Sequence, residues 1–225
     1  MAEAAHGWTP PRHALLRVSP EGWAAMLEMR PEWRGEPLLA GWAWRGWPLV
    51  ARRRGECETA GGIAAGLPLP PSAGKRRLAV LLPGDAVTEI RPPLPLAEAL
   101  PSAPPGWRPV LEALLALGAA HRVTPRVFGS LAWAALTGLD YLGPASDLDL
   151  LWPVLPPPRM AALLAALGGI EARAPMRLDG EVLLPDGSGA NWREIQAGAA
   201  EILVKRAGGV ALLPRADFLG AAGAA

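Results

Sequence analysis

Residues 126–152 of the chain read RVFGSLAWAALTGLDYLGPASDLDLLW. The short apolar run RVF has the composition of a strand, residues 130–137 that of a helix, and DLDLLW again that of a strand. Strands that alternate with helices indicate a mixed α/β (α+β) core. We therefore expect the C-terminal part of the chain to be built around this strand–helix–strand unit.

Two acidic residues, Asp147 and Asp149, interrupt the apolar end of this stretch. Because side chains alternate between the two faces of a strand, both carboxylates project from one face and the leucines pack on the other. Two carboxylates this close repel each other unless a cation lies between them, and Mg²⁺ (or Mn²⁺) held by carboxylates and substrate phosphates meets that need. A solvated strand face is the alternative interpretation.

Gly129 and Ser130 stand between the first strand and the helix. Glycine lets the backbone approach a ligand closely, and the free N–H groups at the start of a helix attract phosphate. The alternative is that Ser130 is only the helix N-cap. A phosphate-binding turn and a metal-binding acidic pair, joined by one helix, are the arrangement of a phosphoryl or nucleotidyl transferase.

Further helices are expected at residues 107–120 and 159–167, on either side of the quoted stretch. Residues 176–195, MRLDGEVLLPDGSGANWREI, are predicted to form a hairpin with its turn at Asp186, Gly187 and Ser188, and Arg193 and Glu194 are expected to pair across it. In its first strand Asp179 and Glu181 share the polar face.

The proline-rich stretch Pro92–Gly106 is predicted to connect two domains, residues 1–100 and residues 107–225. The smaller N-terminal domain has short apolar runs (PLLAGWAW, WPLVARRR, RLAVLLP), which favour a small sheet, with one helix near Glu21 to Met29. Its tryptophans, among them Trp42, Trp44 and Trp47, indicate either a stacking platform for a base or core packing.

Composition excludes several classes of protein. The 225 residues carry 22 basic and 21 acidic side chains, without the positive excess of a nucleic-acid binder. Cys57 is the single cysteine, and it shows no zinc-ligand spacing with the histidines. No apolar run reaches the roughly 18 residues of a membrane span, so we expect a cytoplasmic protein without a membrane or nucleic-acid partner.

The hydrophobic-Gly-Ser turn, the helix and the D-x-D strand together resemble the nucleotidyltransferase superfamily, whose members carry a third carboxylate on a later strand. More narrowly, VFGSLAWAALTGL, SDLDLLW, RLDGEVLLPDG and NWREI resemble the malonate decarboxylase holo-acyl-carrier-protein synthases, the phosphoribosyl-dephospho-CoA transferase family. The resemblance extends to RHALLRV, WPLVARRR and GLPLPPSAGKRRLAVLL. The sixteen residues between Ser130 and Asp147 are a longer spacing than the superfamily pattern, and they leave room for the LDYLGPAS loop.

This resemblance implies a nucleotidyltransferase-fold C-terminal domain. It also implies an enzyme that moves the prosthetic group of 2′-(5″-triphosphoribosyl)-3′-dephospho-CoA to a serine of the apo acyl carrier subunit of malonate decarboxylase and releases pyrophosphate. Asp147, Asp149 and Asp179 would then be catalytic and bind the metal, with Glu181 as the alternate third carboxylate.

Substrate-binding residues implied by the same family are Gly129 and Ser130, with Lys205 in EILVKR as a phosphate-side lysine. Two basic clusters, Arg52-Arg53-Arg54 and Lys75-Arg76-Arg77, would bind the dephospho-CoA phosphates or an acidic carrier surface, or would be solvated strand edges. Two other functions stay open: a nucleotidyltransferase that uses an ordinary NTP, and an inactive binding module of the same fold.

Overall fold

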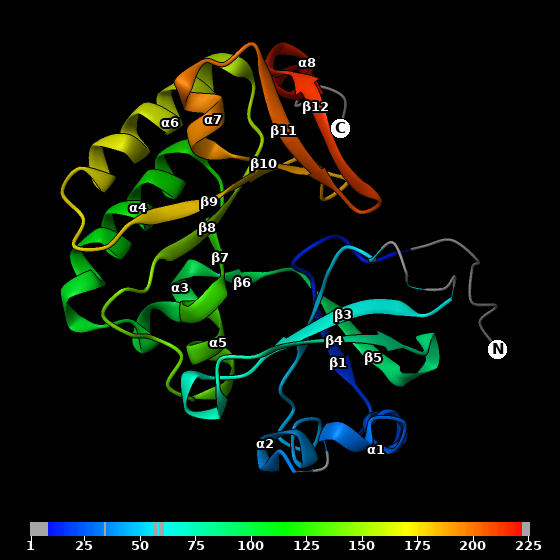
Figure 1. Ribbon diagram of the computed structural model, residues 1–225. Helices are drawn as coiled ribbons and strands as arrows, with labels where there is room; N and C mark the ends of the chain where they lie inside the picture. Colours follow the sequence, from blue (N-terminus) through cyan, green and yellow to red (C-terminus); the bar gives the residue numbers. More distant parts are fainter. Residues whose placement is uncertain (1–8, 34, 56–57, 59–60, 222–225) are drawn as a thin grey trace. The chain divides into compact units, whose positions relative to one another are not determined.

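The computed structural model describes residues 9–33, 35–55, 58 and 61–221, and the chain divides into two units, residues 1–92 and 93–225 (Figure 1). The division falls at the start of the expected connection rather than after it. Residues 93–106 belong to the second unit because Leu94, Leu96 and Ala99 are buried in its core. Pro101 and Pro105 of this stretch lie at the starts of short 3₁₀ helices, and Pro95 lies in a short strand. Cys57 and His6 lie outside the described residues.

The first unit contains a five-stranded antiparallel sheet in the order β4-β3-β2-β1-β5. Its helix α1 begins at Pro20, where the side chain of Ser19 accepts a hydrogen bond from the Gly22 N–H at 3.1 Å. The elements are β1 (Leu15–Val18), α1 (Pro20–Glu28), α2 (Pro37–Ala40), β2 (Leu49–Ala51), β3 (Ile63–Pro68), β4 (Arg77–Leu82) and β5 (Val87–Arg91).

Tryptophans form much of the core of this unit. The indole N–H of Trp23 donates to the Leu39 carbonyl at 2.7 Å, and that of the buried Trp42 donates to the Pro48 carbonyl at 3.1 Å. Trp44 is 76% exposed. Trp42 is therefore a packing residue, and no stacking platform is built from it. The expected strand in PLLAGWAW is wrong, because Pro37 starts the short helix α2 and turns follow it.

The second unit contains a seven-stranded sheet in the order β12-β11-β10-β9-β8-β7-β6. Only the central pair, β8 and β9, is parallel. The elements are β6 (Leu94–Pro95), α3 (Leu96–Ala99), α4 (Arg108–His121), β7 (Arg126–Phe128), α5 (Gly129–Thr137), β8 (Leu148–Pro153), α6 (Pro157–Glu171), β9 (Leu178–Leu183), β10 (Gly189–Asn191), α7 (Trp192–Ala197), β11 (Glu201–Arg206), β12 (Gly209–Pro214) and α8 (Arg215–Gly220).

The two faces of this sheet differ in character. Strand register places Val127 opposite Leu150 and Leu148 beside Leu178, and these side chains form one core with residues of α4, α5 and α6. Figure 1 shows α4 and α6 along one side of the sheet. Because side chains alternate along a strand, the residues between these core positions project from the opposite face. Asp149 and Asp179 are among them, so the sheet has a helix-covered face and an acidic face.

Most of the predicted elements of the second unit are present. The strand at RVF, the helix after Gly129 and the strand in DLDLLW are confirmed, and so is the turn at Asp186, whose side chain accepts a hydrogen bond from the Ser188 N–H at 2.8 Å. The hairpin is shorter than expected, because Asn191 caps the helix α7 and residues 192–197 leave the sheet. The prediction of a mixed α/β chain with a smaller N-terminal unit is confirmed, and the nucleotidyltransferase fold stays a prediction. None of the described helices combines the length and the apolarity that crossing a membrane requires.

Candidate functional site

The acidic pair lies beside the glycine turn, although sixteen residues separate Ser130 from Asp147. Phe128, the last residue of β7, pairs in register with Asp149 of β8. Gly129 has φ +64°, and a Cβ placed on it would lie 1.9 Å from Asp149 Oδ2. A side chain at position 129 would therefore both strain the backbone and displace the carboxylate. The glycine is needed so that the start of α5 can approach the acidic strand.

Ser130 is not the cap of this helix. Helix α5 begins at Gly129, its N-cap is Phe128, and no side chain makes a cap hydrogen bond there. Ser130 is thus the second helical residue, and the cap interpretation is wrong because the left-handed Gly129 starts the helix one residue earlier than the sequence suggests. The first N–H groups of a helix have no intrahelical acceptor, so this end of α5 suits an anion. Its phosphate contact stays a prediction.

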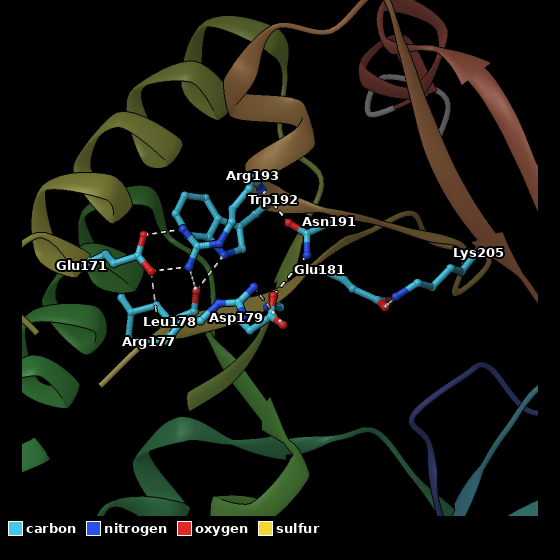
Figure 2. A network of polar contacts seen from close by, with 10 residues as sticks. Glu171, Arg177, Leu178, Asp179, Glu181, Asn191, Trp192, Arg193 and Lys205 are labelled. Carbon is cyan, nitrogen blue, oxygen red and sulfur yellow. Dashed lines mark hydrogen bonds and ion pairs between the residues drawn. The ribbon is translucent and has the colours of Figure 1, made fainter. Parts of the chain in front are cut away.

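Asp179 lies directly beside Asp149. The parallel strands β8 and β9 pair these two residues in register, and neighbouring strands are about 4.8 Å apart. Asp179 Oδ1 accepts hydrogen bonds from the Gly180 N–H at 2.8 Å and from Asn191 Nδ2 at 3.1 Å (Figure 2). Gly180 has φ +142°, and a Cβ there would lie 2.0 Å from the Leu150 carbonyl oxygen, so only glycine permits this strand pairing.

Glu181, the alternate third carboxylate, has a different environment. It is 4% exposed, and its Oε1 lies 2.8 Å from Lys205 Nζ (Figure 2). Lys205 lies on β11 in register with Gly189, which places it on the same face of the sheet. Asp179 also faces a cation, Arg177, but at 3.9 Å, and its side chain is 30% exposed. The two carboxylates therefore differ in burial and in the closeness of their ion pairs.

A network centred on Arg193 supports the start of β9. Its guanidinium pairs with both carboxylate oxygens of Glu171, donates to the Leu178 carbonyl at 2.6 Å, and stacks 4.5 Å from the ring centroid of Trp192 (Figure 2). The hydrogen bonds from Arg193 lower the pKa of Glu171. The pKa of Arg193 is raised chiefly by Glu171 and further by the charges of Asp179 and Asp147, so this cation lies within electrostatic reach of the acidic face.

Sequence reasoning missed this network. The expected pairing of Arg193 with Glu194 is wrong: Arg193 bonds to Glu171, and Glu194 accepts from the Leu203 N–H at 2.9 Å. Nothing local connects residue 171 with residue 193. One part of the network could have been predicted from the sequence. Asparagine is a common helix N-cap, so Asn191 before Trp192 and Arg193 indicates that a helix begins there.

The donor chemistry of the acidic face fits Mg²⁺. Among the described residues, no three His, Cys, Asp or Glu side chains form a group that could hold a metal ion. Mg²⁺ usually takes only one or two protein carboxylates and completes its shell with substrate phosphates and water. Asp149 of β8 and Asp147, one residue before that strand, are both half-buried and supply that number. The metal itself stays a prediction.

The two basic clusters of the first unit are not brought together. Arg52 is anchored beside Ala64 of β3, whereas Arg77 pairs with Pro68 at the other end of that strand. Arg52 hydrogen-bonds to Glu58, which lowers the pKa of Glu58 to about 2.

The other residues of the two clusters differ in the hydrogen bonds and ion pairs that they make. Arg54 donates to the carbonyls of Gly61 and Gly62, and Arg76 lies 2.6 Å from Glu36. Arg53, Lys75 and Arg77 are exposed, and within the described part of the chain no ion pair is assigned to them. These three are therefore the cluster members best placed to meet a ligand.

The fold and the site together define a mixed α/β protein of two units. In its second unit, two neighbouring strands carry Asp149 and Asp179, and a helix that begins at Gly129 lies beside Asp149. Residues 11–93 match the model of the phosphoribosyl-dephospho-CoA transferase MdcG N-terminal domain, and residues 95–216 match that of the MdcG C-terminal domain. The chain belongs to this phosphoribosyl-dephospho-CoA transferase family.

Curated relatives cover nearly the whole chain. A protein of Bradyrhizobium diazoefficiens named phosphoribosyl-dephospho-CoA transferase is 47% identical over 96% of each chain. Proteins of the same name from Xanthomonas euvesicatoria and Xanthomonas campestris are 40% and 43% identical over 91% of this chain and 94% of theirs. No solved structure matches the chain.

Proposed function

We propose that this protein is a phosphoribosyl-dephospho-CoA transferase that loads the apo acyl carrier subunit of malonate decarboxylase. The donor is 2′-(5″-triphosphoribosyl)-3′-dephospho-CoA and the acceptor is a serine hydroxyl. Family membership over both units supports the reaction class. The main observation behind the proposal is the pairing of three neighbouring strands, which places Phe128 of β7 on one side of Asp149 and Asp179 of β9 on the other.

In the proposed reaction, the serine oxygen forms a bond to the α-phosphorus of the donor. The α–β phosphoanhydride bond breaks, pyrophosphate leaves, and the hydroxyl proton passes to a carboxylate oxygen of the acidic face. Phosphoryl transfer of this kind depends on positioning and charge stabilisation more than on covalent help from the protein. No serine, cysteine or histidine nucleophile of this chain is required.

Asp147 and Asp149 would hold Mg²⁺, which supplies charge neutralisation for the triphosphate when bound. The start of α5, with Gly129 and Ser130, would face phosphate oxygens through backbone N–H groups. Asp179 is held by Asn191 on the same face and is the proposed third carboxylate. Lys205 is the proposed phosphate-side cation, although in the free protein it pairs with Glu181.

The choice of the third carboxylate can be tested by a matched pair of substitutions. Asp179→Asn should reduce the rate of carrier loading far more than Glu181→Gln, because Glu181 is already paired with Lys205. Glu181→Gln should instead lower the stability of the fold by about 1–2 kcal/mol, since it leaves an ammonium beside a neutral buried amide. The reverse ranking of rates would give the role to Glu181.

The decisive experiment is the intact mass of a purified apo carrier subunit after incubation with this protein, Mg²⁺ and the donor. The expected gain is the mass of the donor less that of pyrophosphate, located on one serine. A parallel incubation with ATP tests for an ordinary nucleotidyltransferase, which would add AMP. If the carrier subunit gains no mass with the triphosphoribosyl donor, the proposal is refuted. If it gains mass with ATP alone, the donor is an ordinary nucleotide.

A further inference from the structure

A groove of about 400 Å³ lies in the second unit, and its lining contains none of the residues proposed to hold the metal or the triphosphate. Its walls include Pro93, Leu151, Pro153, Leu183 and Pro185, and Arg126 is its charged lining residue. No acidic side chain lines it. A groove with apolar walls and one cation suits a flat apolar group that carries an anion.

The strand register places this groove on the acidic face. Arg126 pairs with Leu151 on β8, and Pro153 pairs with Leu183 on β9. Leu151 stands two residues after Asp149, so both project from the same face of the strand. The step along the strand is about 7 Å. The part of the groove formed by Leu151 and Pro153 therefore continues the face that carries Asp149, and Trp152 and Val154 also belong to the lining.

Arg126 is held in place yet keeps hydrogen-bonding capacity. It is half-buried, and its Nη1 donates to the Pro93 carbonyl. Within the described ranges no acceptor is assigned to Nη2 and no acidic group pairs with Arg126. A guanidinium fixed through one nitrogen can offer the others to a phosphate at a reduced entropic cost.

We propose that this groove binds the adenine nucleotide end of the donor, with the ring between the proline and leucine walls and a 5′-phosphate facing Arg126. The proposal rests on the proposed function for the identity of the donor. In that donor the triphosphoribosyl group is attached to the adenosine 2′ position. The nucleoside is therefore the part of dephospho-CoA nearest to the reacting phosphate, and the pantetheine arm is further away.

The test uses the full-length protein and dephospho-CoA, a fragment that lacks the reacting triphosphate. Binding is measured by isothermal titration without divalent metal, so that no metal ion bridges the catalytic carboxylates and the phosphates of the ligand. Arg126→Gln should weaken binding about tenfold or more, because a charge-assisted contact is lost. Arg126→Lys should retain part of the affinity.

Arg159→Gln is the matched control, since Arg159 also donates to a backbone carbonyl, that of His121, and lies outside the groove. It should bind dephospho-CoA as the unmodified protein does. Leu183→Asp is the second groove variant, and it keeps the test valid if Arg126→Gln does not fold. Leu183 is half-exposed, and a carboxylate there should repel the phosphates and weaken binding by a similar factor.

Competition identifies the end of dephospho-CoA that binds. ADP should displace it, and 4′-phosphopantetheine should not. Wild-type protein that binds dephospho-CoA but loads no carrier would overturn only the proposed function, so the two proposals can be told apart. Unchanged affinity in both groove variants, displacement by 4′-phosphopantetheine alone, or no binding by the wild type would overturn the groove assignment.

Discussion

Asn191 connects the fold of the second unit to its acidic face, and its two amide atoms have separable roles. Its Oδ1 accepts from the Arg193 N–H at 2.9 Å and caps helix α7. Its Nδ2 donates to Asp179 Oδ1 at 3.1 Å. Asn191→Ala removes both contacts. In Asn191→Ser the serine is still a good N-cap, but its side chain is too short to reach Asp179. Comparing the two variants therefore separates the contribution of the cap from that of the hydrogen bond to Asp179.

The expected magnitudes follow from these contacts. Loss of an N-cap costs about 1 kcal/mol, and loss of a hydrogen bond to a carboxylate costs about 1.5 kcal/mol at the low end of its range. The low end applies because the Asp179 side chain is 30% exposed. Asn191→Ala should therefore lower the free energy of unfolding by about 2.5 kcal/mol, and Asn191→Ser by about 1.5 kcal/mol.

Urea unfolding measures both variants, analysed for the transition that unfolds the second unit. A double-mutant cycle with Asp179→Ala isolates the contact, since in that background Asn191→Ser should cost below about 0.5 kcal/mol. Carrier loading by Asn191→Ser should also slow, because the Asp179 carboxylate loses its orientation. A variant Asn191→Ser as stable as the unmodified chain, or a cycle without coupling, would refute this reasoning.

Three further predictions concern the same unit. Asp149→Asn should abolish carrier loading and leave the circular dichroism spectrum and urea midpoint nearly unchanged; loading at a near-normal rate with the same Mg²⁺ requirement would contradict the acidic pair's role. The lowered pKa of Glu171 adds stability that is present above the pKa of an unfolded glutamate and is lost as the pH falls through the lower, folded value. Stability measured between neutral and acidic pH should therefore fall less steeply in Glu171→Gln than in the parent, and identical slopes would exclude the linkage. Ser130→Ala should change stability by less than about 0.5 kcal/mol, because Ser130 makes no cap bond, while the KM for the donor rises if its hydroxyl meets a phosphate. A large loss of stability with unchanged kinetics would restore the cap interpretation.

The local pattern of the sequence was a reliable guide wherever neighbours in the chain decide the outcome. Alternation separated Asp149 from the buried leucines of β8, and glycine marked the turn before α5, whereas Asp147 lies one residue before the strand. The same reasoning failed at residues 37–44, where Pro37 begins a helix, and at Ser130, where a left-handed Gly129 shifts the helix start by one residue. In both cases the failure concerned a boundary set by backbone conformation.

The sequence alone determines three features of the candidate site. Asp147 and Asp149 are two positions apart, Gly129 can adopt a positive φ, and Asp179 and Glu181 share the polar face of their strand. Covalent spacing determines these because side-chain direction alternates with each residue of a strand. Only the tertiary structure decided that β9 lies parallel beside β8, so that Asp179 neighbours Asp149 while Glu181 meets Lys205. Strand order and ion pairing depend on the packing of segments far apart in the chain, and no local pattern encodes them.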